Sequence, residues 1–88
     1  MAEAFLVEAV RSPAVRRGGA LAGVHSADLG AHVLGALVER SGIDPAAVDD
    51  VVFGCTDTIG SQAGDIARTC WLAAGLPEHV PGVTVDRQ

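Results

Sequence analysis

Apolar and polar residues are distributed along the chain in a pattern that predicts three short strands. Ala4–Val10 is an almost continuous apolar run, which is typical of a strand covered on both faces. Val51–Cys55 is a second apolar run, and a third strand begins within Pro81–Gln88, where Val83 and Val85 alternate with polar residues. Because the sequence stops soon after this strand begins, we expect the chain to be the front part of a larger protein.

A long amphipathic helix is predicted between the first two strands. Its apolar stripe consists of residues at helical spacing, namely Leu29, Val33, Leu34, Leu37 and Val38. Ser26 is the predicted N-cap, and Asp28 lies in the first turn, where a negative charge suits the helix dipole. Gly42 is predicted to end the helix in the left-handed conformation, and Asp44–Pro45 starts a short helical turn.

A second helix is predicted at about Ala63–Ala74, and Gly75 is predicted to end it. Its first turn contains Asp65, which has the i, i+3 spacing to Arg68 that allows a side-chain pair. Six residues are predicted to line the buried side: Ile66, Ala67, Cys70, Trp71, Ala73 and Ala74. Trp71 is the single tryptophan of the sequence, and we assign it to the core or an interface rather than to ligand stacking.

The predicted order is strand, helix, strand, helix, strand. Two successive βαβ units require a parallel sheet with the helices as cover, so we predict an α/β fold with a mostly parallel sheet. The 88 residues, 49% of them hydrophobic, suit one small domain close to the size at which a single core is marginal.

Charge and apolar content argue against several classes of partner. The formal net charge of −5 is unfavourable for nucleic-acid binding, which requires a basic surface. The start of the sequence lacks the basic and long apolar regions of a signal peptide, and no run approaches the roughly 18 apolar residues of a membrane span. We therefore expect a cytoplasmic protein without a membrane partner.

The two cysteines, Cys55 and Cys70, are the first candidates for chemistry. They form no C-x-x-C motif and have no matching histidine pair, so we predict no metal site. A disulfide stays open, although reduced thiols suit a cytoplasmic protein better. Cys55 lies at the carboxyl end of a predicted strand, where α/β sheets place ligands, but no histidine near it in sequence could activate it. We favour a structural role for Cys55 over a catalytic one.

The connection Arg11–Val24 is locally basic, with arginines at positions 11, 16 and 17. It could contact an anionic ligand, but we favour a solvated surface loop whose arginines pair with acidic residues elsewhere. Gly18–Gly23 is not a P-loop, because the closing Gly-Lys-Ser/Thr is missing. A solvated or locally hydrogen-bonded state is favoured for His32, and His79 is too isolated for an assignment.

Four landmarks, in order, carry a resemblance to the N-terminal segment of the thiolases (acetyl-CoA acetyltransferases). They are Val7–Pro13 with Gly18–Ala22, then Val51–Gly54, then Gln62–Gly75, and finally Leu76–Pro77 with Val80–Val85. The resemblance covers essentially the whole chain. It implies that residues 1–88 are a partial thiolase N-terminal domain, the first βαβαβ portion of that fold. Departures at Ser12, Ala14–Val15 and Asp65–Ile66 leave the substrate subfamily open.

The resemblance implies an acyltransferase of fatty acid metabolism that makes or cleaves 3-ketoacyl-CoA by ping-pong acyl transfer. Coenzyme A and acyl-CoA are then substrates, and no covalently bound cofactor is expected. In this family the nucleophilic cysteine follows the last strand segment directly, which is after Gln88. Cys55 and Cys70 match no catalytic position of the family. We therefore assign no catalytic residue to this chain, leave its coenzyme A-binding residues unknown, and expect it to be inactive alone.

The resemblance also implies the remainder of the thiolase polypeptide as a partner, and a homodimer or homotetramer. Gly82–Arg87 is then expected near a subunit interface, because an uncovered strand edge invites pairing. Two alternatives remain open. One is a non-catalytic thiolase-like interaction or carrier protein that has lost its nucleophile. The other is a small doubly wound cofactor-binding domain, although Arg11–Gly19 lacks the required glycine spacing.

Overall fold

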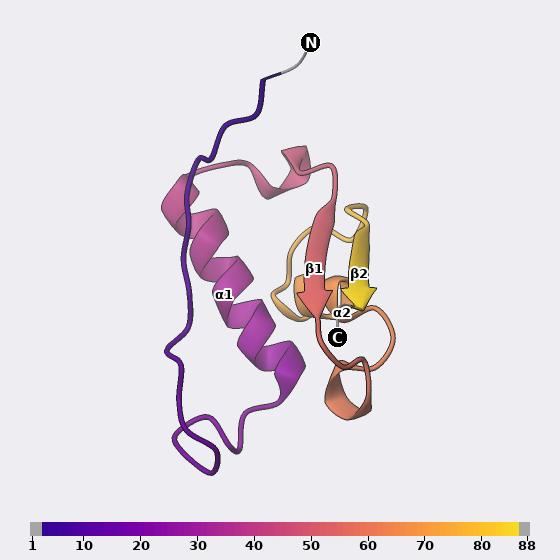
Figure 1. The fold of residues 1–88 in the computed structure, drawn as a ribbon. Coiled ribbons are helices and arrows are strands. Elements are labelled where there is room, and N and C mark those ends of the chain that lie inside the picture. Colours follow the sequence, from indigo (N-terminus) through magenta and orange to yellow (C-terminus); the bar gives the residue numbers. More distant parts are fainter. Residues whose placement is uncertain (1–2, 87–88) are drawn as a thin grey trace.

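A computed structural model describes residues 3–86 of the chain (Figure 1). Its regular elements are two helices, α1 (Ser26–Ser41) and α2 (Ile66–Ala73), and two strands, β1 (Val51–Cys55) and β2 (Gly82–Asp86). Short 3-10 turns lie at residues 45–47 and 60–62. The α/β fold class is therefore confirmed, and both predicted helices are present in the predicted order.

The two strands form a parallel sheet in which Val51 lies opposite Gly82 and Cys55 lies opposite Asp86. Helix α2 is the crossover between them, so the second of the two predicted βαβ units is confirmed. The strand predicted within Pro81–Gln88 is also confirmed, as far as Asp86. Arg87 and Gln88 lie outside the described residues.

The strand predicted at Ala4–Val10 is wrong for this structure. These residues have no regular secondary structure and pass along α1 (Figure 1), where Phe5 is 79% exposed, Leu6 90% and Val7 69%. A strand requires a neighbour that takes its backbone N–H and C=O groups. Within residues 3–86, β1 pairs with β2 and no strand pairs with the N-terminal run. The run therefore stays solvated despite its apolar sequence.

The start of α1 differs by one residue from the prediction, because His25 rather than Ser26 is the N-cap. The Nδ1 atom of His25 accepts a hydrogen bond from the Ala27 N–H at 3.1 Å. The Ser26 hydroxyl is instead engaged with the loop after β1, at 2.6 Å from Ser61 Oγ and 3.2 Å from Gln62 Oε1. At the other end, the predicted cap is confirmed: Gly42 adopts φ 72° and its N–H bonds the Val38 carbonyl.

Helix α2 begins later than predicted, at Ile66 instead of Ala63. Gly64 adopts φ 72°, a left-handed conformation that interrupts the helical path, and Asp65 becomes the N-cap. The predicted end of the helix before Gly75 is confirmed. Its buried residues are Ile66, Ala67, Cys70 and Trp71, whereas Ala73 is exposed, so the predicted buried side was too wide.

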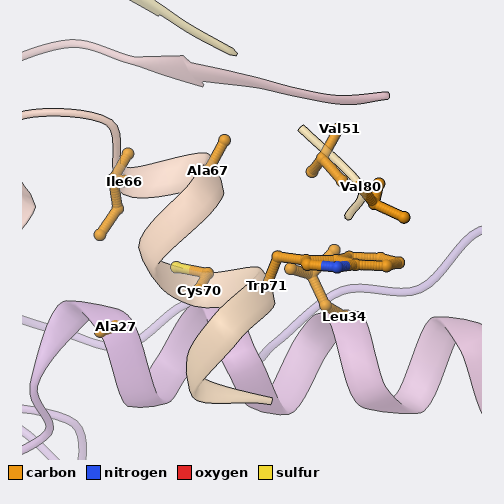
Figure 2. Close-up of a cluster of buried hydrophobic side chains, with 8 residues drawn as sticks. All are labelled: Ala27, Leu34, Val51, Ile66, Ala67, Cys70, Trp71 and Val80. Carbon is orange, nitrogen blue, oxygen red and sulfur yellow. The ribbon is translucent and has the colours of Figure 1, made fainter. Parts of the chain in front are cut away.

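Among the described residues, the core consists of eight that are buried, drawn in Figure 2: Ala27, Leu34, Val51, Ile66, Ala67, Cys70, Trp71 and Val80. Helix α2 lies between α1 and the strands, and the Trp71 ring lies between Leu34 on one side and Val51 and Val80 on the other. Its Nε1–H donates to the Pro77 carbonyl at 2.6 Å. The ring thus has both an apolar pocket and a partner for its polar atom, which confirms the predicted core role of Trp71.

Candidate functional site

The carboxyl ends of β1 and β2 lie side by side, with Cys55 opposite Asp86. In open α/β sheets this is the edge at which ligands bind. The loop after β1 closes over it: the Thr58 hydroxyl donates to Asp86 Oδ2 at 3.3 Å. Asp86, where β2 ends, therefore lies at the edge of the sheet at which ligands usually bind.

Cys55 is half-buried at this edge, and its Sγ donates to the Asp57 carbonyl at 3.4 Å. Among residues 3–86, no hydrogen bond joins it to a histidine. His25 caps α1, His32 is exposed on the same helix, and His79 Nε2 lies 3.1 Å from the Ala46 carbonyl. Cys55 thus lies at the sheet edge where ligands usually bind, but no histidine is hydrogen-bonded to it as an activating base within residues 3–86. A structural role for Cys55 therefore stays our prediction.

Cys70 is buried on α2 at the contact with α1. A Cβ atom at Gly30 would overlap its Sγ, so the two helices approach closely where the thiol lies. The thiol points to the Ser26 carbonyl, at 3.9 Å, and burial raises its pKa above the ordinary value of 9.0. A buried neutral thiol is a poor nucleophile, so Cys70 is a packing residue. Both cysteines are free.

A group of connected polar contacts joins the first turn of α2 to β2; we call it the α2–β2 clamp. The Thr84 hydroxyl accepts from the Ala67 N–H at 3.2 Å and donates to Asp65 Oδ1 at 2.9 Å. The same Oδ1 accepts from the Arg68 N–H at 3.3 Å. Two N–H groups that a helix start leaves without intrahelical partners are thereby satisfied.

Two further contacts complete the α2–β2 clamp. The Arg68 guanidinium donates from Nη1 to the Val80 carbonyl at 2.7 Å. At Gly82 an added Cβ would lie 2.9 Å from the Arg68 backbone nitrogen and 3.2 Å from the Ala67 Cβ. The backbone of β2 therefore passes directly against the first turn of α2, at a position where only glycine fits.

The clamp shows how Asp65 and Arg68 are bonded, and it adds one finding. The i, i+3 spacing of Asp65 and Arg68 allows a side-chain pair, but in the structure the Asp65 carboxylate accepts from the Arg68 backbone N–H and the guanidinium donates to the Val80 carbonyl. The reason is that Asp65 precedes the helix as its N-cap. The role of Thr84 was missed, although the period-2 alternation of β2 places it on the opposite face from Val83 and Val85.

The arginine-rich connection Arg11–Val24 lies on the surface. Arg11, Arg16 and Arg17 are all exposed, which agrees with the surface-loop interpretation. Arg11 lines an open surface hollow of about 380 Å³ with Ala9, Val10 and Arg40. Within the described part of the chain, no cluster of three or more metal-ligating side chains could hold an ion, and no helix is long and apolar enough to cross a membrane.

Comparison with known proteins extends these observations. The family described as thiolase, N-terminal domain, matches residues 4–88. The steroid 3-ketoacyl-CoA thiolase FadA6 of Mycobacterium tuberculosis is 64% identical over 88 residues, which are 100% of this chain and 22% of that protein. A beta-ketoadipyl-CoA thiolase of Pseudomonas aeruginosa is 49% identical over 86 residues, which are 97% of this chain and 21% of that protein.

A solved structure gives the same result. The Bacillus anthracis acetyl-CoA acetyltransferase superposes with a TM-score of 0.69 at 40% identity, over 81% of this chain and 18% of that chain. The chain therefore spans about a fifth of the length of the proteins that it matches.

Proposed function

This chain belongs to the thiolase family, and from that premise we propose that the intact protein is a 3-ketoacyl-CoA thiolase. One structural observation carries the proposal. Strand β2 runs parallel to β1 and ends with it at the same sheet edge, so the segment that holds the nucleophile in this family would begin at the usual ligand-binding edge. The family match favours this function over a small doubly wound cofactor-binding domain.

The proposed reaction is a two-step acyl transfer that needs only coenzyme A as second substrate. The cysteine thiolate following β2 attacks the C3 carbonyl carbon of a 3-ketoacyl-CoA, and the C2–C3 bond breaks. The electron pair stays on C2, which takes a proton and leaves as acetyl-CoA, while the acyl group remains on sulfur as a thioester. The thiol of coenzyme A then attacks the thioester, which releases the shortened acyl-CoA and regenerates the enzyme thiol.

The role of residues 3–86 in this reaction is to support rather than to react. A thiolate is stabilised at the start of a helix by the dipole and by free N–H groups, and the strand before it must hold that start in place. Cys55 and Cys70 are not needed for the proposed transfer. The names of the relatives, one acting on steroid 3-ketoacyl-CoA and another on beta-ketoadipyl-CoA, support 3-ketoacyl-CoA as the substrate class.

The test uses the intact protein with a 3-ketoacyl-CoA and coenzyme A, and measures acetyl-CoA by mass spectrometry. Replacing the cysteine after β2 by alanine should lower the rate by several orders of magnitude. The matched control is Cys55→Ala, which should leave the rate within a few-fold. A folded intact protein that produces no acetyl-CoA and carries no acyl group would instead support the non-catalytic, carrier-like alternative.

We also propose a cytoplasmic location and a homodimer or homotetramer, with Gly82–Arg87 near the subunit interface. Support for the interface comes from the side of β2 facing away from α2, where Val83 is 46% exposed and Val85 47%; Arg87 lies outside the described residues. Analytical ultracentrifugation of the intact protein tests the assembly, and a single monomeric species would overturn it.

The cytoplasmic location is supported by the two free cysteines, which suit a reducing compartment. Fractionation of the source cells tests the location, and recovery of the protein outside the cytoplasm would overturn it.

A further inference from the structure

Three alternate positions face α2, one just before β2 and two within it, and each makes a different contact with the helix. At Val80 the backbone carbonyl receives the Arg68 guanidinium, and at Gly82 the backbone lies against Ala67 and Arg68. At Thr84 the hydroxyl bonds the helix start. The strand is thus fixed along its length by one charged contact, one steric contact and one directional polar contact.

Of the two positions within β2, Thr84 is the one at which an apolar side chain would also fit. Valine has nearly the same shape, is favoured in strands, and has no hydroxyl to desolvate at this half-buried site. The hydroxyl offers what valine lacks, an acceptor for the Ala67 N–H and a donor for Asp65. These two bonds fix the position of β2 along the axis of α2, and they fix the distance between β2 and the start of the helix.

We propose that Thr84 is a positioning residue for the nucleophile that follows β2; this inference rests on the proposed function. It acts through the strand and touches no substrate. Thr84 lies two positions before Asp86, where the described strand ends, so a shift of β2 against α2 is passed directly to the segment that follows. A displacement of about 1 Å at reacting atoms can cost roughly 100-fold in rate.

The test compares Thr84→Val with Thr84→Ser in the intact protein. Thr84→Val keeps the shape but loses both hydrogen bonds, and kcat for thiolysis should fall about 10- to 100-fold while KM stays within about two-fold. Thr84→Ser keeps the hydroxyl and should retain kcat within about three-fold. The matched control is Thr69→Val on α2, whose hydroxyl bonds only the Asp65 carbonyl within the helix, and its kcat should be unchanged.

A second readout separates this proposal from the proposed function. Iodoacetamide alkylation of the cysteine after β2, followed by peptide mass spectrometry, reports the reactivity of the thiolate without any acyl-CoA. Alkylation should be slower in Thr84→Val than in wild type, and its rate in Thr84→Ser should be close to that of wild type. An inactive wild-type protein whose cysteine is still alkylated in this order would reject the thiolase function but support the positioning role.

Two results overturn the positioning role. One is equal kcat and equal alkylation rates for wild type and Thr84→Val. The other is an equal loss in Thr84→Ser and Thr84→Val, which would show that the hydroxyl is not the cause. If Thr84→Val does not fold, Asp65→Ala replaces it, because this change removes the acceptor that orients the hydroxyl. It should lower kcat several-fold, and an unchanged kcat would overturn the proposal equally.

Discussion

The longer of the two helices has the smaller number of buried residues. Helix α1 has 16 residues and buries only Ala27 and Leu34, whereas the 8 residues of α2 include four that are buried. The position of α2 between α1 and the strands explains the difference (Figure 2), because both sides of the short helix are covered. Buried apolar area, rather than helix length, determines how much each helix stabilises the structure.

The helices also differ in how their ends are satisfied. Helix α1 is capped by the residues next to it in sequence, His25 and Gly42. Helix α2 receives one of its caps from Thr84, which lies 17 positions from Ala67 along the chain. Helix α1 is therefore specified locally, and α2 is specified by the strand that follows it. Substitutions at the centre of α2 should therefore affect stability more than substitutions at the cap of α1.

Trp71→Ala should have the largest effect on stability. The ring is 2% exposed, contacts both layers of the core, and loses its hydrogen bond to Pro77 on truncation. We expect the free energy of unfolding of the intact protein to fall by about 3–5 kcal/mol, measured by urea denaturation. The control on the same helix is Leu72→Ala, where the side chain is 44% exposed and the loss should be about 1 kcal/mol or less. Similar losses for the two variants would show that α2 is not the central element.

The contrast between local and tertiary specification also explains what the sequence could predict. Helix α1, the turn at Asp44–Pro45 and the stop at Gly75 have caps and breakers in adjacent residues, and all three were predicted. Ala4–Val10 is more apolar than β2, yet of these two segments only β2 forms a strand, because β1 pairs with it and α2 packs against it. The pattern of side chains predicts which face a strand would bury. It does not show whether a neighbouring strand is present to pair with its backbone N–H and C=O groups.

The same limit applies to the candidate site. Aspartate is a typical N-cap residue, so the residue type of Asp65 is consistent with its function. The helix start was predicted too early, because the spacing of apolar residues does not reveal the left-handed conformation of Gly64. The partnership of Asp65 with Thr84 joins residues 19 positions apart and exists only once β2 lies on α2. The position of Cys55 at the sheet edge was predicted, since the end of a strand is defined locally.

Gly30→Ala should have the next largest effect, at the contact between the two helices. The new methyl group would overlap the thiol of Cys70, which α2 presents to α1. Overpacking of this kind typically costs about 1–3 kcal/mol, so the urea midpoint should fall accordingly. Cys70→Ala combined with Gly30→Ala should recover part of the loss, because it removes the atom that is overlapped.

Gly35→Ala is the matched control for Gly30→Ala, since it makes the same change in the same helix. A Cβ atom at Gly35 meets nothing within 4 Å. Alanine is favoured over glycine in a helix by about 0.5–1 kcal/mol, so this variant should be slightly more stable than wild type. Opposite signs for the two variants would place the steric limit at the helix contact. A loss at both positions would instead show that α1 is covered on a second side in the intact protein.

Cys70 adds a pH dependence to the same contact. Burial raises the pKa of its thiol above 9.0 in the folded state, so the folded protein holds this proton more tightly than the unfolded chain. The resulting stabilisation is complete below pH 9.0 and is lost as the pH rises through the higher folded value. Urea denaturation below and above this pH should show the decline in wild type and in Cys55→Ala. A decline of the same size in Cys70→Ala would assign it to another group.

The smallest effect is expected where α1 depends on its own sequence, at His25. Histidine caps through Nδ1, whereas aspartate is among the strongest N-cap residues and adds a negative charge at the positive end of the dipole. His25→Asp should therefore raise stability by about 0.5–1 kcal/mol, visible as a higher melting temperature. His32→Asp changes the same residue type at an exposed position inside α1, where aspartate is a weaker helix former, and should give no gain. Because both variants change net charge equally, a gain at both would attribute the effect to charge, and a gain at His25 alone would confirm that α1 is limited by its cap.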